Sequence, residues 1–275
     1  MSKEIAIRLS FFLGILICVA TWELLAPRRG LTTSKIIRWF GNLAIILLNA
    51  VGIRLLFPIL PVGLALVAQK NGWGLLNNFD LPYWLAVIVG VIVLDLVIYL
   101  QHVMFHAVPV FWRLHMMHHA DLDFDVTTGL RFHPVEIILS SGIKLAAVVV
   151  LGPPALAVLV FEVLLNATSM FNHGNIRIPT SVDAVLRLFV VTPDMHRVHH
   201  SVVIKETNSN FGFNLPWWDR LLGTYRDQPA AGHREMTIGL SQFRDAKRLT
   251  LPWMLALPFI GEIGKYTINR GGGGV

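Results

Sequence analysis

The sequence predicts an all-α protein, a multi-pass membrane bundle of about four to five spanning helices. Charged residues make up 15% of the 275 residues, against about 25% in typical soluble domains, and hydrophobic residues make up 54%. So few charges could not cover that much apolar surface in a soluble protein of this size. The apolar residues also gather into runs long enough to cross a bilayer. The same composition excludes a disordered or collagen-like chain.

The net charge of the chain bears on whether it binds nucleic acid or lipid headgroups. Lysine and arginine outnumber aspartate and glutamate by 23 to 17, a net charge of +6, yet no dense basic run exists. Basic pairs such as Arg28-Arg29 instead flank apolar stretches, which fits anionic lipid headgroups better than nucleic acid. We therefore expect no nucleic-acid partner. The single cysteine, Cys18, excludes an intramolecular disulfide and a cysteine-based metal site.

The first apolar run covers residues 5–25 and is long enough to span the hydrocarbon core. Lys3 and Arg8 at its start would also suit a cleaved signal peptide. However, the run is long for a signal, and Thr21-Trp22-Glu23 does not resemble a small-residue cleavage site. We expect an anchor helix that is retained.

Three further apolar stretches follow, at residues 39–58, 81–100 and 135–170. The last is too long for one helix and is broken at Gly152-Pro153-Pro154, which predicts a helical hairpin. Residues 57–68 also stay apolar but contain two prolines, so they form either a kinked continuation or a re-entrant piece.

The orientation follows from the basic residues. The connection after the first span carries four of them, Arg28, Arg29, Lys35 and Arg38, which places it in the cytoplasm. Counting the crossings from there puts the polar parts after residue 100 on the cytoplasmic side as well.

The chain divides into three predicted parts. Residues 1–84 hold the N-terminal transmembrane helices, residues 85–226 a catalytic domain with a cytoplasmic helical cap, and residues 227–275 a C-terminal segment. Within the last part, residues 251–263 are apolar but too short to span, which favours an interfacial segment. Residues 271–274 are a glycine run that reads as a flexible tail.

The number and spacing of the histidines indicate the chemistry of the protein. Of the eleven histidines, ten lie between residues 102 and 200, and His233 alone reads as an ordinary core or surface residue. Eight of the ten form one H-x-x-x-H pair and two H-x-x-H-H clusters: His102 and His106; His115, His118 and His119; His196, His199 and His200. His133 and His173 complete the ten.

These spacings suit metal binding. Residues three or four apart share one face of a helix, so an H-x-x-x-H pair can hold one ion, and the extra histidine of H-x-x-H-H can reach a second. Imidazole suits iron, zinc, copper and nickel. Up to ten nitrogen ligands are too many for one ion but suit two, so the cap is predicted to hold a dimetal site.

The sequence lacks the motifs of several common enzyme classes. It contains no H-E-x-x-H zinc-protease motif, no G-x-S-x-G nucleophile elbow and no G-x-G-x-x-G dinucleotide fingerprint. Oxygen activation at a pair of irons is the favoured interpretation. A zinc-dependent membrane hydrolase and a non-enzymatic protein that stores or transports metal remain as alternatives.

The motifs around the histidines resemble those of the fatty acid hydroxylase/sterol desaturase superfamily. The resemblance covers about residues 85–226 and rests on these motifs: Asp95-x-x-x-Tyr99-x-x-His102-x-x-x-His106, Trp112-Arg113-x-His115-x-x-His118-His119, Arg131-Phe132-His133-Pro134-x-Glu136, Thr192-Pro193-Asp194-x-His196-x-x-His199-His200, Asn208-Ser209-Asn210-Phe211-Gly212 and Trp218-Asp219-Arg220-x-x-Gly223-Thr224-Tyr225. Val103 departs from the common H-R-x-x-H form. Ser169 stands where fatty-acyl hydroxylases place another histidine, which favours the sterol-desaturase-like branch.

The resemblance implies a membrane non-haem di-iron oxygenase that hydroxylates or desaturates a lipid such as a sterol, a fatty acyl chain or an alkylglycerol. It implies two iron ions, which zinc could replace in a purified form, and O2 as cosubstrate. The implied ligands are His102, His106, His115, His118, His119, His133, His173, His196, His199 and His200.

Carboxylates are expected to accept the second N–H of the ligating imidazoles. Asp95, Glu136 and Asp194 are the chosen candidates, and Asp95 is notable because it lies inside an apolar span. Asp121, Asp123 and Asp125 could do the same or lie in a solvated loop.

The expected partners are a lipid substrate that enters from the bilayer and a separate electron donor, either a reductase or a small redox protein. The donor is inferred because the sequence has no flavin, haem or dinucleotide motif of its own. The sequence carries no signal for an oligomeric state.

Overall fold

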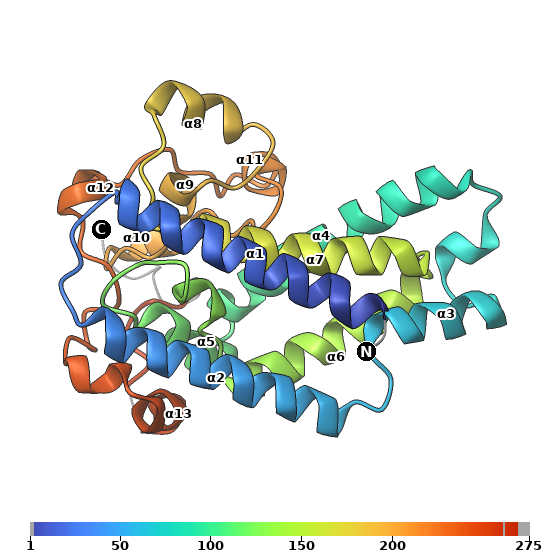
Figure 1. Ribbon diagram of the computed structural model, residues 1–275, viewed down its shortest axis with the longest axis horizontal. Coiled ribbons are helices and arrows are strands. Elements are labelled where there is room, and N and C mark those ends of the chain that lie inside the picture. The colour runs from blue at the N-terminus through green and yellow to red at the C-terminus, as the bar shows by residue number, and fades with distance from the viewer. Residues whose placement is uncertain (1–2, 261, 269–275) are drawn as a thin grey trace.

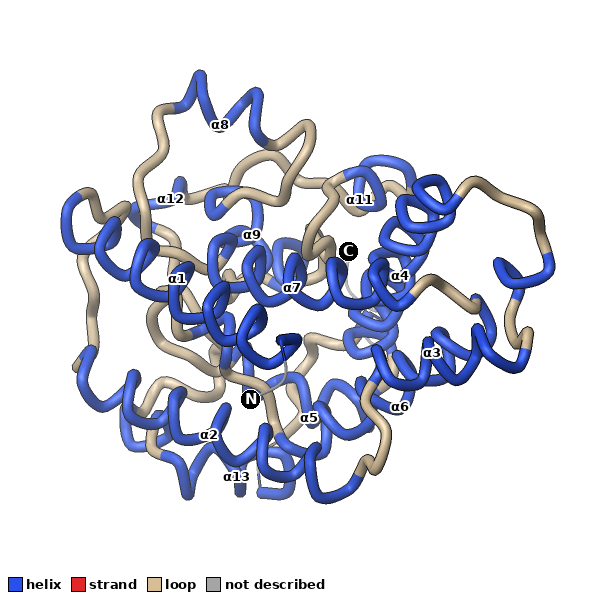
Figure 2. The backbone as a smooth tube through the Cα atoms, turned by 45° about the vertical axis from the view of Figure 1, so that its right-hand side comes forward, coloured by secondary structure: helices blue, strands red, loops and turns tan. Residues whose placement is uncertain are grey.

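The computed structural model describes residues 3–260 and 262–268, and in these residues the chain is helical with two isolated β-bridges and no strand (Figures 1 and 2). The predicted all-α class is thereby confirmed. The glycine run at residues 271–274 lies outside the described residues.

Five stretches of helix are long and apolar enough to cross a membrane, as predicted. The long helices are α1 (Lys3–Leu25), α2 (Lys35–Leu56), α4 (Tyr83–Ala107), α6 (Pro134–Leu151) and α7 (Ala155–Asn172). Large apolar side chains on α1, such as Phe11 and Ile17, are more than half exposed, as expected of a surface that faces lipid. The chain is therefore built as a multi-pass membrane protein.

Shorter helices connect these spans or form the cap. They are α3 (Pro61–Asn71), η1 (Leu75–Asn78), α5 (Pro109–His119), η2 (Thr128–Leu130), α8 (Thr180–Leu186), α9 (Pro193–His199), α10 (Ile204–Thr207), α11 (Trp217–Leu221), α12 (Gly232–Glu235), η3 (Ala246–Leu249) and α13 (Leu251–Ile260). The helices α8 to α12 gather at one end of the bundle, while α3 and the start of α4 lie toward the other end (Figure 1).

The apolar segment at residues 57–68 contains a break followed by a new helix. Phe57 is extended and ends α2, and Pro61 then occupies the first turn of α3, where a missing backbone N–H costs nothing. Helix α3 packs against α6 and α7, so the segment is joined to the bundle.

The predicted hairpin turns at Gly152, whose backbone is left-handed with φ of 63°. Its Cα lies so close to the connection after α3 that an added Cβ would stand 2.4 Å from the Trp73 carbonyl oxygen. Helix α7 then packs closely on α4, where a Cβ at Gly90 would come within 2.9 Å of the Ala157 side chain. Small residues thus allow the two central spans to approach closely.

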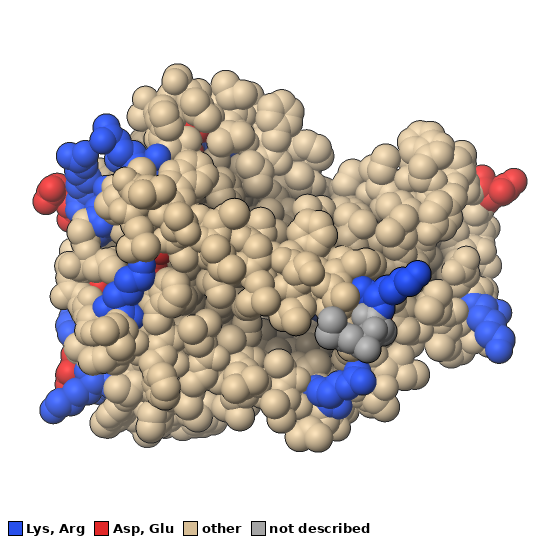
Figure 3. Space-filling model, in the orientation of Figure 1, with Lys and Arg blue, Asp and Glu red and all other residues tan. Residues whose placement is uncertain are grey.

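Charged side chains gather at the end of the bundle that carries the cap (Figure 3). Figure 3 shows Lys and Arg side chains over this end, a broad uncharged region across the middle, and isolated charges toward the other end. That distribution fits a bundle that crosses a bilayer with its cap in water.

One ion cluster lies within the spans themselves. Arg8 of α1 and Lys144 of α6 both donate to the Glu162 carboxylate of α7, at 2.6 Å and 2.8 Å. The Glu162 side chain is only 8% exposed. The cluster therefore ties three spanning helices together through one buried carboxylate.

Replacing that carboxylate should loosen the bundle. Glu162→Gln leaves two cations facing a neutral amide. We expect the free energy of unfolding to fall by about 3 kcal/mol, near the low end of the range for a broken buried ion pair, because Arg8 is partly exposed. The measurement is the thermal unfolding midpoint in detergent, with the exposed Asp80→Asn as control. An unchanged midpoint in Glu162→Gln would show that the cluster does not hold the helices.

Candidate metal centre

Four helical segments deliver the histidines to one place. Helix α4 runs further than its apolar stretch, to Ala107, so His102 and His106 lie one turn apart on the same face. Helix α5 follows after the extended Val108 and supplies three histidines, and α9 supplies two more and ends in His200. His173 caps the C-terminus of α7.

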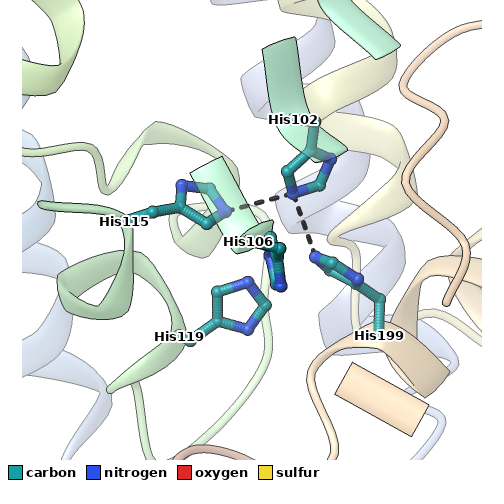
Figure 4. A group of neighbouring side chains, drawn as sticks. All are labelled: His102, His106, His115, His119 and His199. Carbon is teal, nitrogen blue, oxygen red and sulfur yellow. Dashed lines mark hydrogen bonds between the residues drawn. The ribbon is translucent and has the colours of Figure 1, made fainter. Parts of the chain in front are cut away.

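Nine of the ten predicted ligands come together in two neighbouring groups. His102, His106, His115, His119 and His199 form group one, and His118, His173, His196 and His200 form group two. Within each group one nitrogen per ring lies within 4.8 Å of all the others, and all nine residues are buried. The five rings of group one converge on a common centre (Figure 4). The two groups adjoin where the rings of His119 and His200 stack, with 4.6 Å between the ring centres.

The proton on most of these rings is fixed by an oxygen acceptor. In group one, the Nδ1–H of His102 and of His199 donates to the backbone carbonyls of Phe211 and Ser209, each at 2.7 Å. The Nδ1–H of His115 donates to Glu136 at 2.7 Å. A neutral imidazole carries one N–H, so in these three rings Nε2 is left with a bare lone pair.

The bare nitrogens point at one another. The Nε2 atom of His102 lies 3.1 Å from Nε2 of His115 and 3.0 Å from Nε2 of His199. With both Nδ1 protons committed elsewhere, neither ring of a pair has a hydrogen to place between them. Facing lone pairs at this distance repel unless a cation lies between them. The donor set therefore fits a bound metal ion.

Group two shows the same pattern. The Nδ1–H of His173 donates to the Ser169 carbonyl at 2.7 Å, and that of His118 donates to the Arg131 carbonyl at 3.2 Å. Their Nε2 atoms then face each other at 3.2 Å. Other ring nitrogens, among them Nε2 of His106, His119 and His200, are buried without a hydrogen-bond partner in the described part of the chain. Metal ligation would satisfy them.

Burial keeps the imidazoles in their neutral, metal-binding form. Removal from water disfavours the charged form and lowers the pKa of His173 to about 3. The pKa values that fall well below the usual 6.5 are those of His118, His119, His196, His199 and His200.

A short segment of the cap supplies three of the acceptors for group one. In residues 208–211, Asn208 accepts from His106 through its side-chain oxygen, and the next two acceptors are the Ser209 and Phe211 carbonyls. Asp219 holds this segment because its carboxylate accepts the backbone N–H groups of Phe211 and Gly212, each at 2.8 Å. The Asn-Ser-Asn-Phe-Gly and Trp-Asp motifs thus orient the ligands.

Of the three chosen carboxylates, Glu136 alone contacts one of the nine histidines. Asp95 instead accepts from the Trp218 indole at 2.8 Å and from the Leu215 backbone, which ties α4 to the cap. Asp194 forms a two-pronged ion pair with Arg28 and a further pair with Arg197. Four of the nine imidazoles instead donate to backbone carbonyls, so these rings have no need of the two carboxylates.

The three aspartates at residues 121–125 are neither in a solvated loop nor bonded to imidazoles. The Asp121 carboxylate receives two hydrogen bonds from Arg38 of α2, and Asp125 receives a third at 2.5 Å. Burial alone would raise the pKa of Asp121, but Arg38 lowers it to about 2. Asp123 accepts from the backbone and hydroxyl groups of Thr32 and Thr33. The trio therefore fastens the loop after α5 to α2 and to the connection that precedes α2.

His133, also predicted as a ligand, lies apart from both groups. Its Nδ1 accepts from the Val135 backbone N–H and so caps α6, while its Nε2–H donates to the Leu255 carbonyl of α13 at 3.2 Å. Both ring nitrogens are therefore already in use. His233, expected to be an ordinary core or surface residue, is buried 3.6 Å from Asp194 and also outside both groups.

The sequence reasoning missed the contribution of Gly129. An added Cβ at this position would lie 2.4 Å from the Ser169 carbonyl oxygen, the acceptor of His173, and 3.2 Å from His173 Nδ1. The Ser169 hydroxyl, in turn, donates to the Gly129 carbonyl at 2.8 Å. A glycine in Thr127-Thr128-Gly129, just before the Arg-Phe-His-Pro motif, could have signalled such a close backbone approach.

A fatty acid hydroxylase family model matches residues 87–224, about half of the chain. The chain belongs to the fatty acid hydroxylase family. The resemblance inferred from the histidine motifs is thereby confirmed, whereas the three-part division of the chain stays a prediction. No solved structure matches the chain.

Relatives of this family member are lipid hydroxylases and monooxygenases. Ornithine lipid hydroxylase OlsE of Rhizobium tropici is 27% identical over 233 residues, which cover 82% of this chain and 69% of that protein. Human alkylglycerol monooxygenase is 27% identical over 163 residues, 56% of this chain and 34% of its own length. Methylsterol monooxygenase 2-2 of Arabidopsis thaliana is 24% identical over 169 residues, 60% of this chain and 63% of its own. The chain thus spans about a third of the alkylglycerol monooxygenase.

In this member of the family a cavity of about 490 Å³ leads to group one. His102 and His115 line one end, and Arg8, Lys144 and Glu162 line the other. Most of its lining residues come from the spanning helices α2, α4, α6 and α7, and a little over half of all the lining residues are apolar. The cavity therefore lies among the spans, where an apolar molecule can reach the histidines without crossing water.

Gly129→Ala should damage group two selectively. The new methyl group displaces the Ser169 carbonyl, so His173 loses one of its two acceptors and keeps the Asn172 side-chain oxygen at 2.6 Å. We therefore expect metal affinity at group two to fall about 10-fold. The measurement is metal bound per chain during titration with a competing chelator. The matched control is Gly142→Ala on α6, where an added Cβ meets nothing within 4 Å. Equal metal binding in both variants would contradict the role given to Gly129.

Proposed function

We propose that this protein is a membrane-bound di-iron oxygenase that uses O2 and external electrons to hydroxylate or desaturate a C–H bond of a lipid. The observation that carries the proposal is the pair of adjacent imidazole groups, with facing lone pairs, at the end of a cavity among the spanning helices. The names of the relatives, which are lipid hydroxylases and monooxygenases, support the reaction class.

The proposed ligands are the nine histidines of the two groups, five for one ion and four for the other. His133 is left out because both of its nitrogens are engaged with backbone groups. Imidazole is a good ligand for iron, and two irons supply the redox capacity to activate O2 for attack on an unactivated C–H bond.

The residues of the chain hold and orient the reactants. The carbonyls of residues 208–211 and the Glu136 carboxylate fix the ring orientations in group one. Glu136 also brings a negative charge beside an otherwise neutral set of ligands. The apolar cavity wall excludes water and positions a lipid carbon near His102 and His115.

The proposal places the metal centre on the cytoplasmic side. The support is the basic connection between α1 and α2, which lies at the same end of the bundle as the cap (Figures 1 and 3). A separate electron donor would then approach the cap from the cytoplasm, while the lipid enters from the bilayer.

Loss of a single ligand from either group should abolish turnover. We expect His118→Ala and His199→Ala each to lower the amount of lipid product formed with O2 by at least about 10³-fold, because each histidine is needed to hold one ion. Lipid mass spectrometry of cells with and without the gene provides the readout, a gain of one oxygen or a loss of two hydrogens. His233→Ala, outside both groups, is the matched control. Preserved turnover in both ligand variants would overturn the proposal.

Metal removal should destabilise the protein as well. Without a cation the facing Nε2 lone pairs repel, so chelation should lower the unfolding midpoint and Fe²⁺ should restore it. Purified protein that contains zinc and forms a hydrolysis product without O2 would instead support a metal-dependent hydrolase. A metal-loaded protein with no lipid product under any condition would support storage or transport.

A further inference from the structure

The cavity wall beside the metal centre holds side-chain oxygens with nothing to accept from. Within residues 3–260 and 262–268, Asn49 Oδ1, Gln101 Oε1 and Glu136 Oε2 are buried and have no hydrogen-bond partner. They come from α2, α4 and α6, and all three residues line the cavity together with His102 and His115. Three helices thus bring acceptors to the end of the cavity where the metal groups lie.

The orientation of Asn49 is fixed by its surroundings. Its amide nitrogen donates to the Phe132 carbonyl at 2.9 Å, and a carbonyl can only accept, so the amide cannot be turned around. Its oxygen must therefore remain the unpartnered atom. Asn49 is only 7% exposed, and Phe132 stacks on His118 with 4.4 Å between the ring centres. The unpartnered oxygen therefore belongs to a residue bonded directly to the wall of the metal centre.

The other two acceptors lie next to ligands. Gln101 precedes His102 in the chain, and its side-chain amide nitrogen donates to the Ser140 hydroxyl at 3.0 Å. Glu136 uses Oε1 to hold His115, which leaves Oε2 without a partner. By contrast Lys144, eight residues or ~12 Å further along α6, brings N–H donors to the far end. Unpartnered acceptors are thus a feature of the metal end, whereas the Glu162 carboxylate at the far end accepts from Arg8 and Lys144.

A buried acceptor without a donor is costly, and convergent polar groups in an apolar pocket commonly orient a ligand. We propose that Asn49, Gln101 and Glu136 form a recognition site for a hydroxyl or amide N–H group that the lipid carries close to the carbon that reacts. The position of the reacting carbon rests on the proposed function, whereas binding of the donor group does not. A lipid that offers only hydrocarbon at this point leaves the acceptors unpartnered and binds more weakly.

The test is a competition between two probes that differ only in their hydroxyls. Iron-loaded protein in detergent is equilibrated with equal amounts of 1-O-hexadecylglycerol and its di-O-methyl ether, and the lipid retained after gel filtration is quantified by mass spectrometry. We expect the wild-type protein to retain the hydroxyl-bearing probe about tenfold in excess. In Asn49→Leu the excess should fall to near one.

The controls separate recognition from folding. Asn71→Leu makes the same change at an exposed position on α3 and should keep the preference. If Asn49→Leu does not fold, Gln101→Met provides a second removal of an acceptor and should lower the preference. Bound iron is measured in every variant to show that the metal groups are intact.

Retention of both probes equally, or of neither, by the wild-type protein would overturn the inference. Full preference in a folded acceptor variant would overturn it as well. Because the readout is binding and not turnover, a protein that prefers the hydroxyl-bearing probe yet forms no oxidised product would defeat the oxygenase proposal alone. A wild-type protein that shows no preference between the probes yet forms oxidised product would defeat the recognition site alone.

Discussion

The metal centre depends on where each imidazole keeps its single proton. Because an oxygen acceptor holds the Nδ1–H of rings such as His102, His115 and His199, their Nε2 atoms must present lone pairs to one another. The arrangement is unfavourable by itself and becomes favourable around a cation. Burial strengthens both the repulsion and the attraction of a cation, and it lowers the pKa of His199, which keeps that ring neutral. The same hydrogen bonds therefore create the need for metal and set its position.

Those hydrogen bonds are only as rigid as the backbone that supplies the acceptors. Asp219 holds the segment that faces group one, and the contact between Gly129 and Ser169 positions the acceptor for group two. Further out, Arg38 and the aspartates at residues 121–125 fasten the loop after α5 to α2, while Glu23 of α1 accepts from the backbone of Val126. The N-terminal helices are thus joined to the centre by buried charge as well as by apolar packing.

Much of this architecture is predictable because the signals are local. Hydropathy locates the spans, the Gly-Pro-Pro turn locates the hairpin, and histidine spacing identifies eight of the nine residues that converge. Backbone carbonyls, however, have no side-chain signature, so the acceptors for four of the nine rings could not be inferred. The same gap explains why Asp95 and Asp194 were expected beside imidazoles, whereas they bind Trp218 and Arg28. His133 shares a motif with Glu136, and only its contacts with the Val135 backbone and the distant Leu255 show that both ring nitrogens are engaged away from the metal groups.

The cavity has different chemistry at its two ends. Unpartnered acceptors lie beside His102 and His115, and the cations Arg8 and Lys144 lie at the opposite end with Glu162 between them. An amphiphilic lipid in such a cavity is not free to reverse, because reversal would place its donors against cations and leave the acceptors unpartnered. Apolar packing along the wall cannot select one carbon among many equivalent methylene groups. Polar groups at fixed positions can, so the choice of reacting carbon is a property of the ends of the cavity and not of its length.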